Sequence, residues 1–180
     1  PEHMILGLLK TKKGVAYNIF KELKINDDDL AHTIIKPIEK EMPETLTILR
    51  LAKQEARALG KNIVGTEMFL LGIIGEATGV GAQVLSKLEI TIKDARILVE
   101  RIVGQGSNYF DNEMVFTKRA KRVLETAWEH AKKAGKLKIE SSDLLYAITT
   151  EPESTAMQVL EQLGTDVLEI REGIKNIIKV

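Results

Sequence analysis

Side chains that could carry out acid–base or metal chemistry are few and widely spaced in this sequence. The three histidines, His3, His32 and His130, form no HExxH or HxH motif and no histidine–carboxylate pair at metal-ligand spacing. His130 lies in the lysine-rich stretch EHAKKAGKLK, which is typical of a solvent-exposed helix face. The absence of cysteine excludes disulfides, thiolate nucleophiles and cysteine-ligated metals. We therefore expect no bound metal and no cofactor.

Motifs for nucleotide, acyl or calcium chemistry are also missing. No GxSxG, GxGxxG or GxxxxGK[ST] occurs, and the stretch from Gly72 to Gly79 lacks a lysine that would reach a phosphate. The run Asp27–Asp29 lacks the alternating ligands and closing glutamate of an EF-hand loop, so we interpret it as helix capping. The sequence thus predicts a protein that is not an enzyme.

Charge and hydropathy exclude two further classes of partner. The 26 basic and 26 acidic side chains give a net charge of zero, without the positive surplus that nucleic-acid binding needs. No apolar run approaches the ~20 residues of a membrane span. We therefore expect partners that are neither nucleic acid nor membrane. Because the chain begins at Pro1, we also expect the natural N-terminus to lie upstream.

Internal repeats organise the chain. A constant shift of 65 residues aligns Glu2 with Glu67 and Gly7 with Gly72, and a shift of 75 aligns Leu49 with Leu124 and Arg96 with Arg171. Neither comparison needs a gap. The sequence therefore predicts a partial repeat in residues 1–40, which lacks its opening helix, and two full repeats in residues 43–106 and 115–180.

Each full repeat has the periodicity of four short helices, so we expect an all-α fold in a compact array. Glycines at 60 and 135 are expected to end the opening helices, and the segments Thr66-Glu67 and Ser141-Ser142-Asp143 to cap the second helices. A small residue in mid-helix, Gly72, predicts close approach of another backbone. The opening helices carry matching apolar stripes: Leu49, Ala52, Ala56 and Leu59, repeated as Leu124, Ala127, Ala131 and Ala134.

These repeats resemble a known family. The stretch LAKQEARALGKNIVGTEMFLLGIIGEATGVGAQVLSKLEI and the later FTKRAKRVLE are similar to the N-terminal repeat domain of Clp chaperones, particularly ClpC of cyanobacteria and plastids. The resemblance implies a non-catalytic module that docks adaptors or substrates for an ATP-dependent unfoldase ring feeding the ClpP protease. The alternative is a stand-alone Clp-repeat protein, like plant ClpT, that attaches to the ClpP core or the unfoldase. Either implies a bacterial cytoplasm or a plastid stroma.

The resemblance also implies candidate binding residues. Some ClpC relatives recognise phosphorylated arginine through the glutamate of a GTEH motif and the threonine of an FTxRA opening. Glu67 and Glu2 match the glutamate, and Thr117 with Arg119 matches the opening. Ser142 replaces the glutamate in the last repeat, with Asp143 one step away. Since no single repeat holds both halves, adaptor docking is favoured over phosphoarginine binding; the candidates are Glu2, Thr66, Glu67, Thr117, Arg119, Ser142 and Asp143.

Two surface features have both a structural and a binding interpretation. The lysines at 132, 133, 136 and 138 form a solvated face or a surface for an acidic partner. The first repeat lacks the helix that would cover the apolar side chains of Met4, Leu8, Ile19, Phe20 and Leu23. Because such faces cannot stay exposed, we expect a neighbouring repeat or a homodimer to bury them.

Overall fold

The computed structural model describes residues 44–107 and 114–178. The chain divides into two units, Pro1–Pro43 and Glu44–Val180, and only the second contains described residues. The partial repeat, Glu2, the run Asp27–Asp29, and the burial or dimer expected for the first repeat therefore lie outside the described residues.

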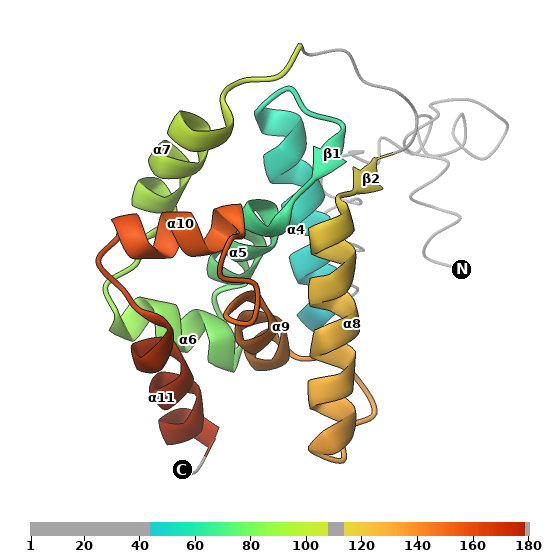
Figure 1. The fold of residues 1–180 in the computed structure, drawn as a ribbon, viewed down its shortest axis with the longest axis vertical. Helices are drawn as coiled ribbons and strands as arrows, with labels where there is room; N and C mark the ends of the chain where they lie inside the picture. Colours follow the sequence, from blue (N-terminus) through green and yellow to red (C-terminus); the bar gives the residue numbers. More distant parts are fainter. Residues whose placement is uncertain (1–43, 108–113, 179–180) are drawn as a thin grey trace, which may run out of the picture. The chain divides into compact units, whose positions relative to one another are not determined.

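The described residues form the all-helical fold predicted from the sequence (Figure 1). The helices of the first repeat are α4 (Glu44–Ala58), α5 (Thr66–Glu76), α6 (Val80–Lys87) and α7 (Ile92–Val103). Those of the second are α8 (Lys118–Lys133), α9 (Ser141–Ile148), α10 (Thr155–Gln162) and α11 (Val167–Ile178). Within the described ranges no single helix is long and apolar enough to cross a membrane. Helices α5 and α6, which are bent by 90° relative to each other, reach that length and apolar composition only when taken together.

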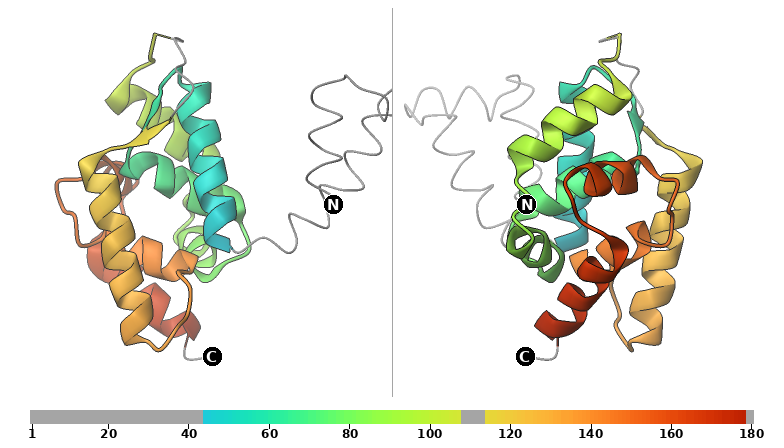
Figure 2. Two further views of the ribbon diagram at one scale, coloured as in Figure 1. Left: turned by 90° about the vertical axis from the view of Figure 1, so that its right-hand side faces the viewer. Right: turned by 60° about the vertical axis from the view of Figure 1, so that its left-hand side comes forward.

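The second helices of the two repeats form the centre of one shared core. Helix α5 buries every residue from Thr66 to Ile73, and α9 buries most of its length. Helix α4 packs on α5 and α8 on α9, while α10 packs on α5 and α6 on α9, so each third helix covers the other repeat's second helix. The long helices α4 and α8 lie on one side of this core, with α7, α10 and α11 on the other (Figure 2). The repeats therefore fold together.

The opening helices pack through the small side chains predicted from the sequence, since Ala52, Ala56, Ala127 and Ala131 are all fully buried. The difference lies at the first position of each stripe. Ile48 and Val123 are fully buried, whereas Leu49 and Leu124 are only partly buried. The buried face of α4 thus follows the spacing i, i+4, i+8. The close backbone contact predicted at Gly72 is confirmed, because a Cβ there would lie 2.6 Å from the Ile48 carbonyl oxygen.

The ends of the opening helices follow the prediction, because Gly60 and Gly135 adopt φ of 69° and 72°. The predicted caps of the second helices are wrong. Gly65 precedes α5 without a side-chain cap, and Glu140 caps α9 in a reciprocal capping box with Asp143. The predicted starts of these helices are confirmed, since Thr66 and Ser141 are their first residues and Glu67 and Asp143 lie in their first turns.

Thr66 and Ser141 cap helices of the opposite repeat. The Ser141 hydroxyl accepts a hydrogen bond of 2.8 Å from the backbone N–H of Gly81 in α6. The Thr66 hydroxyl accepts one of 3.3 Å from Ala156 in α10. Both pairs are related by the 75-residue shift. The two repeats therefore cap each other reciprocally, by contacts that no comparison within one repeat could show.

One element departs from the all-helical expectation. Strand β1 (Ile63–Val64) pairs in parallel with β2 (Val115–Phe116), aligning Ile63 with Val115 and Val64 with Phe116. Each strand has two residues, too short for an alternating pattern to appear in the sequence. The pairing ties the start of the second repeat to the first.

Candidate functional site

A pocket of about 490 Å³ is formed by both repeats and is lined by the predicted site residues Glu67 and Thr117. The pairing of β1 and β2 brings them there. Thr117 follows β2 directly and donates its backbone N–H to Val64 at 3.0 Å, while Glu67 lies in the first turn of α5, three residues after β1. The two residues expected from the family resemblance thus come from different repeats. The sequence argues against phosphoarginine binding because no single repeat holds both the glutamate and the threonine. That argument does not apply to a pocket that two repeats form together.

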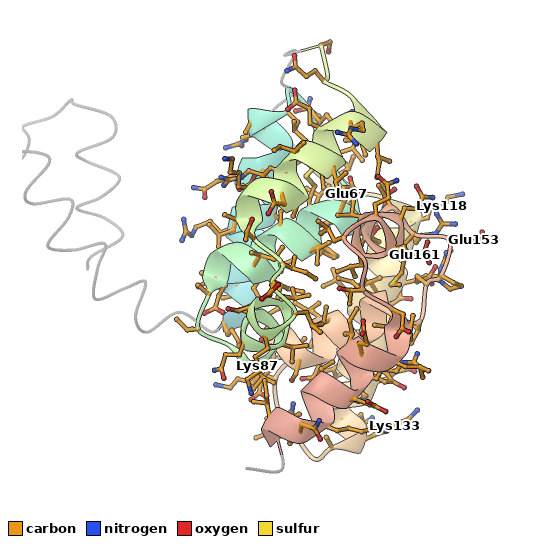
Figure 3. All side chains as sticks on the ribbon, turned by 90° about the vertical axis from the view of Figure 1, so that its left-hand side faces the viewer. Glu67, Lys87, Lys118, Lys133, Glu153 and Glu161 are labelled. Carbon is orange, nitrogen blue, oxygen red and sulfur yellow. The ribbon has the colours of Figure 1, made fainter. Side chains whose placement is uncertain are left out.

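Glu67 is a desolvated carboxylate at the wall of the pocket, labelled on α5 in Figure 3. Its residue is 7% exposed, and its carboxylate folds over Gly65, where a Cβ would lie 2.3 Å from both carboxylate oxygens. Burial raises the pKa of Glu67 above its ordinary value of 4.5, although a backbone N–H and the charge of Lys61 act in the opposite direction. A cationic partner would therefore stabilise the charged form.

Thr117 presents a hydroxyl at the start of α8. Its oxygen accepts a 3.0 Å hydrogen bond from the backbone N–H of Ala120, as an N-cap does, so the hydroxyl hydrogen is available to a ligand. The N-terminus of a helix also favours negative charge. Lys61 lines the same pocket and donates from Nζ to the Val103 carbonyl at 2.9 Å. The pocket therefore offers an anionic wall at Glu67 and anion-favouring groups at Thr117 and Lys61.

The other four predicted residues in the described part of the chain do not line this pocket. Thr66 caps α10, as described above. Arg119 faces the loop before α10, where it donates to the carbonyl of Glu153 at 2.9 Å and lies 3.4 Å from the carboxylate of Glu151. Ser142 is fully buried and lies 3.5 Å from the Lys136 ammonium group. These side chains have structural partners within the described part of the chain.

Asp143 belongs to a buried polar cluster. It is fully buried and accepts hydrogen bonds from Lys136 at 3.1 Å and from the backbone N–H of Glu140 at 3.0 Å. His130 Nδ1 lies 2.7 Å from its other oxygen, and the imidazole stacks on Tyr146 at 4.1 Å. His130 is therefore held by structural contacts and is only partly exposed, at 31% of its side chain, rather than lying on a fully solvated face. Position 143 corresponds to the core residue Met68, and a carboxylate at a core position needs such partners.

The described residues contain no group of three or more His, Cys, Asp or Glu side chains that could hold a metal ion.

The four lysines at 132, 133, 136 and 138 differ in their surroundings. Lys132, Lys133 and Lys138 are exposed, whereas Lys136 is half-buried against Asp143 and Glu140. Burial alone would lower the pKa of Lys136, but its bonds to Glu140 and Asp143 raise it above the ordinary value.

The chain is similar to ATPase subunits of Clp proteases. It is 46% identical over 136 residues to the "ATP-dependent Clp protease ATP-binding subunit ClpA homolog" of Porphyra purpurea. The aligned region covers 76% of this chain and 17% of that protein. It is equally 46% identical over 136 residues to the chloroplastic chaperone protein ClpC of Pisum sativum, covering 76% of this chain and 15% of that protein. The chain thus matches a small part of these much longer relatives.

Solved structures show the same fold. The N-terminal domain of the chaperone ClpD from Arabidopsis thaliana superposes with a TM-score of 0.63 at 24% identity, covering 77% of this chain and 94% of that domain. The Hsp104 N-terminal domain from Candida albicans gives a TM-score of 0.60 at 16% identity, covering 73% and 86%. The family described as "Clp repeat (R) N-terminal domain" matches residues 43–163 and again 116–179, consistent with an internal duplication. The chain therefore belongs to the Clp repeat N-terminal domain family.

Proposed function

We propose that this chain is a non-catalytic docking module that receives adaptors or protein substrates for a Clp-type ATP-dependent unfoldase, in a bacterial cytoplasm or a plastid stroma. The observation that carries the proposal is the pocket to which one repeat contributes Glu67 and the other Thr117. Membership of the Clp repeat family supports the same role. The pocket binds a side chain of a partner protein and leaves its chemistry unchanged.

The ligand class that fits this pocket carries a positive and a negative group close together. A guanidinium group would donate to the desolvated carboxylate of Glu67 in charge-assisted hydrogen bonds. A phosphoryl group attached to it would take hydrogen bonds from the Thr117 hydroxyl and the start of α8, with Lys61 on the same pocket wall. Phosphorylated arginine combines both groups. Phosphorylated arginine is therefore the ligand that this pocket favours, although the sequence alone favours adaptor docking over phosphoarginine binding.

A competition assay tests the docking function. A reconstituted ClpC–ClpP reaction degrades a protein that carries phosphorylated arginine, and the isolated chain is added in excess as a competitor. We expect degradation to slow while ring ATP hydrolysis is unchanged, and we expect a Glu67→Gln competitor to be much weaker. A matched Glu129→Gln competitor, altered at an exposed carboxylate on α8, should inhibit like the wild type. Undiminished degradation with excess wild-type chain would contradict the proposal.

A pull-down from native lysate addresses the alternative role. Recovery of adaptors or client proteins that are lost with Glu67→Gln agrees with docking through the pocket. Recovery of ClpP core subunits independent of Glu67, with the bait as a separate short polypeptide, would instead support a stand-alone regulator of the protease.

A further inference from the structure

Two grooves related by the 75-residue shift differ in charge. The first lies in the first repeat, has a volume of about 560 Å³ and includes Glu55, Leu71, Arg96 and Glu100. The second lies in the second repeat, has about 290 Å³ and includes His130, Tyr146, Arg171 and Lys175 at the corresponding positions. The arginine is retained, whereas both carboxylates of the first groove are replaced. The internal duplication therefore provides its own comparison.

The first groove satisfies its own charges. Arg96 pairs with Glu55 through two hydrogen bonds of 3.0 and 2.5 Å. The Glu100 carboxylate accepts a 2.7 Å hydrogen bond from the side chain of Gln105. An incoming carboxylate would compete with Glu55 for Arg96 and meet the repulsion of Glu100. This groove is therefore a poor anion site.

The second groove has the same arginine without its carboxylate. Arg171 donates from Nε to the Thr149 hydroxyl at 3.0 Å, and its guanidinium lies 5.2 Å from the centre of the Tyr146 ring. These contacts hold the guanidinium in place without neutralising it. His130, which replaces Glu55, directs Nδ1 to the buried Asp143. The counter-ion that the first repeat supplies from its own chain is absent from the second groove.

The surroundings of the second groove define what would bind there. Lys175 is exposed and makes no ion pair with any described residue. The exposed Lys133, labelled in Figure 3, lies in the last turn of α8. Ile178 lines the groove and is 54% exposed, so the charged groups border an apolar wall. Cationic groups beside an open apolar wall complement a carboxylate that is followed by an apolar side chain.

We propose that the groove between α8, α9 and α11 binds a protein segment in which an acidic residue lies beside an apolar one, with the carboxylate on Arg171 and Lys175 and the apolar side chain against Ile178. None of the residues that line this groove also lines the Glu67 pocket. The proposal is therefore independent of the docking function argued above and would be a second contact surface.

The test is an NMR titration of the isotope-labelled chain with a capped peptide of alternating aspartate and leucine. We expect shift changes concentrated on Tyr146, Arg171 and Lys175, including the Arg171 Nε–H signal. Lys175→Glu introduces at this position the acidic residue that the first groove has. It should weaken peptide binding roughly five-fold or more, because it removes one exposed ion pair and places a like charge beside the peptide carboxylate. The exposed Lys93→Glu on α7 has the same charge change and should alter affinity less than about two-fold.

Three results would overturn the proposal. The first is equal weakening by Lys93→Glu and Lys175→Glu, which would mean diffuse attraction between net charges. The second is equal binding of the peptide in which asparagine replaces aspartate, which would show that the carboxylate is not recognised. The third is the absence of shift changes at Arg171 in a wild-type chain whose spectrum is that of a folded protein.

Discussion

The reciprocal caps between the repeats give the sharpest prediction about stability. Ser141 is fully buried, and its hydroxyl is the acceptor for the Gly81 N–H at 2.8 Å. Replacing it with alanine keeps nearly the same volume but leaves that buried N–H without an acceptor. An unsatisfied buried donor costs about 1–3 kcal/mol, and loss of a helix N-cap about 0.5–2 kcal/mol. Both ranges describe the loss of the same hydrogen bond, so the two costs are not added. We therefore expect Ser141→Ala to lower the free energy of unfolding by about 2 kcal/mol.

The symmetry-related position sets the comparison. Thr66→Val also removes a hydroxyl acceptor without a change of shape, but its bond from Ala156 is longer, at 3.3 Å. A hydrogen bond at that distance lies beyond the usual range for N–H···O pairs, so we expect a cost of about 1 kcal/mol or less. Ser86→Ala, at an exposed serine on α6, is the control and should be neutral.

Urea denaturation measures both effects. Far-ultraviolet circular dichroism follows all helices, while fluorescence of the single tryptophan, Trp128 on α8, follows the second repeat. Since the repeats share one core and cap each other, we expect the two transitions to coincide in the wild type and in both variants. A Ser141→Ala cost no larger than that of Ser86→Ala, or a larger cost for Thr66→Val than for Ser141→Ala, would refute the reasoning.

Three further predictions concern single positions. Gly72→Ala should destabilise the fold by about 1–2 kcal/mol in urea denaturation, since its Cβ would meet the Ile48 carbonyl oxygen at 2.6 Å, even though alanine normally favours a helix; a gain in stability would contradict the close packing. Glu67→Gln should raise the melting temperature at neutral pH but not below pH 4.5. The folded pKa of Glu67 is raised, so wild-type stability falls as pH rises from 4.5 through that folded value; lower stability of the variant at neutral pH would contradict this. Asp143→Asn should cost about 2–3 kcal/mol in thermal denaturation because Lys136 loses its buried carboxylate, and a cost below about 1 kcal/mol would contradict the importance of that cluster.

The sequence predicts helices and repeats well because both leave local or strictly periodic signals. The apolar spacing of the helices, the helix-ending glycines and the close contact at Gly72 all agree with the structure. On α4 the predicted Ala52 and Ala56 are buried, but the fully buried residue before them is Ile48, while the predicted Leu49 is only partly buried. Ile48 and Leu49 are equally apolar, so periodicity alone does not choose between them. Such choices depend on the neighbouring helix.

The contacts between repeats could not be predicted from one repeat at a time. Ser141 has the residue type of an N-cap, but the helix that it caps belongs to the other repeat. The candidate site follows the same rule, since Glu67 and Thr117 come from different repeats and meet through strands of two residues. The partner of His130 could have been inferred from alignment of the repeats, because Asp143 occupies the position of a buried methionine.

The most direct test of the docking proposal is calorimetric titration of the chain with a peptide that contains one phosphorylated arginine. We predict binding by the wild type and by Glu129→Gln with equal affinity. For Glu67→Gln we predict a loss of about ten-fold or more, since hydrogen bonds to a charged group contribute about 1.5–3 kcal/mol. The same peptide with unmodified arginine should bind more weakly to the wild type, because nothing occupies the side of the pocket at Thr117. Equal affinity of the wild type and Glu67→Gln for the phosphorylated peptide, or no binding at all, would contradict the account.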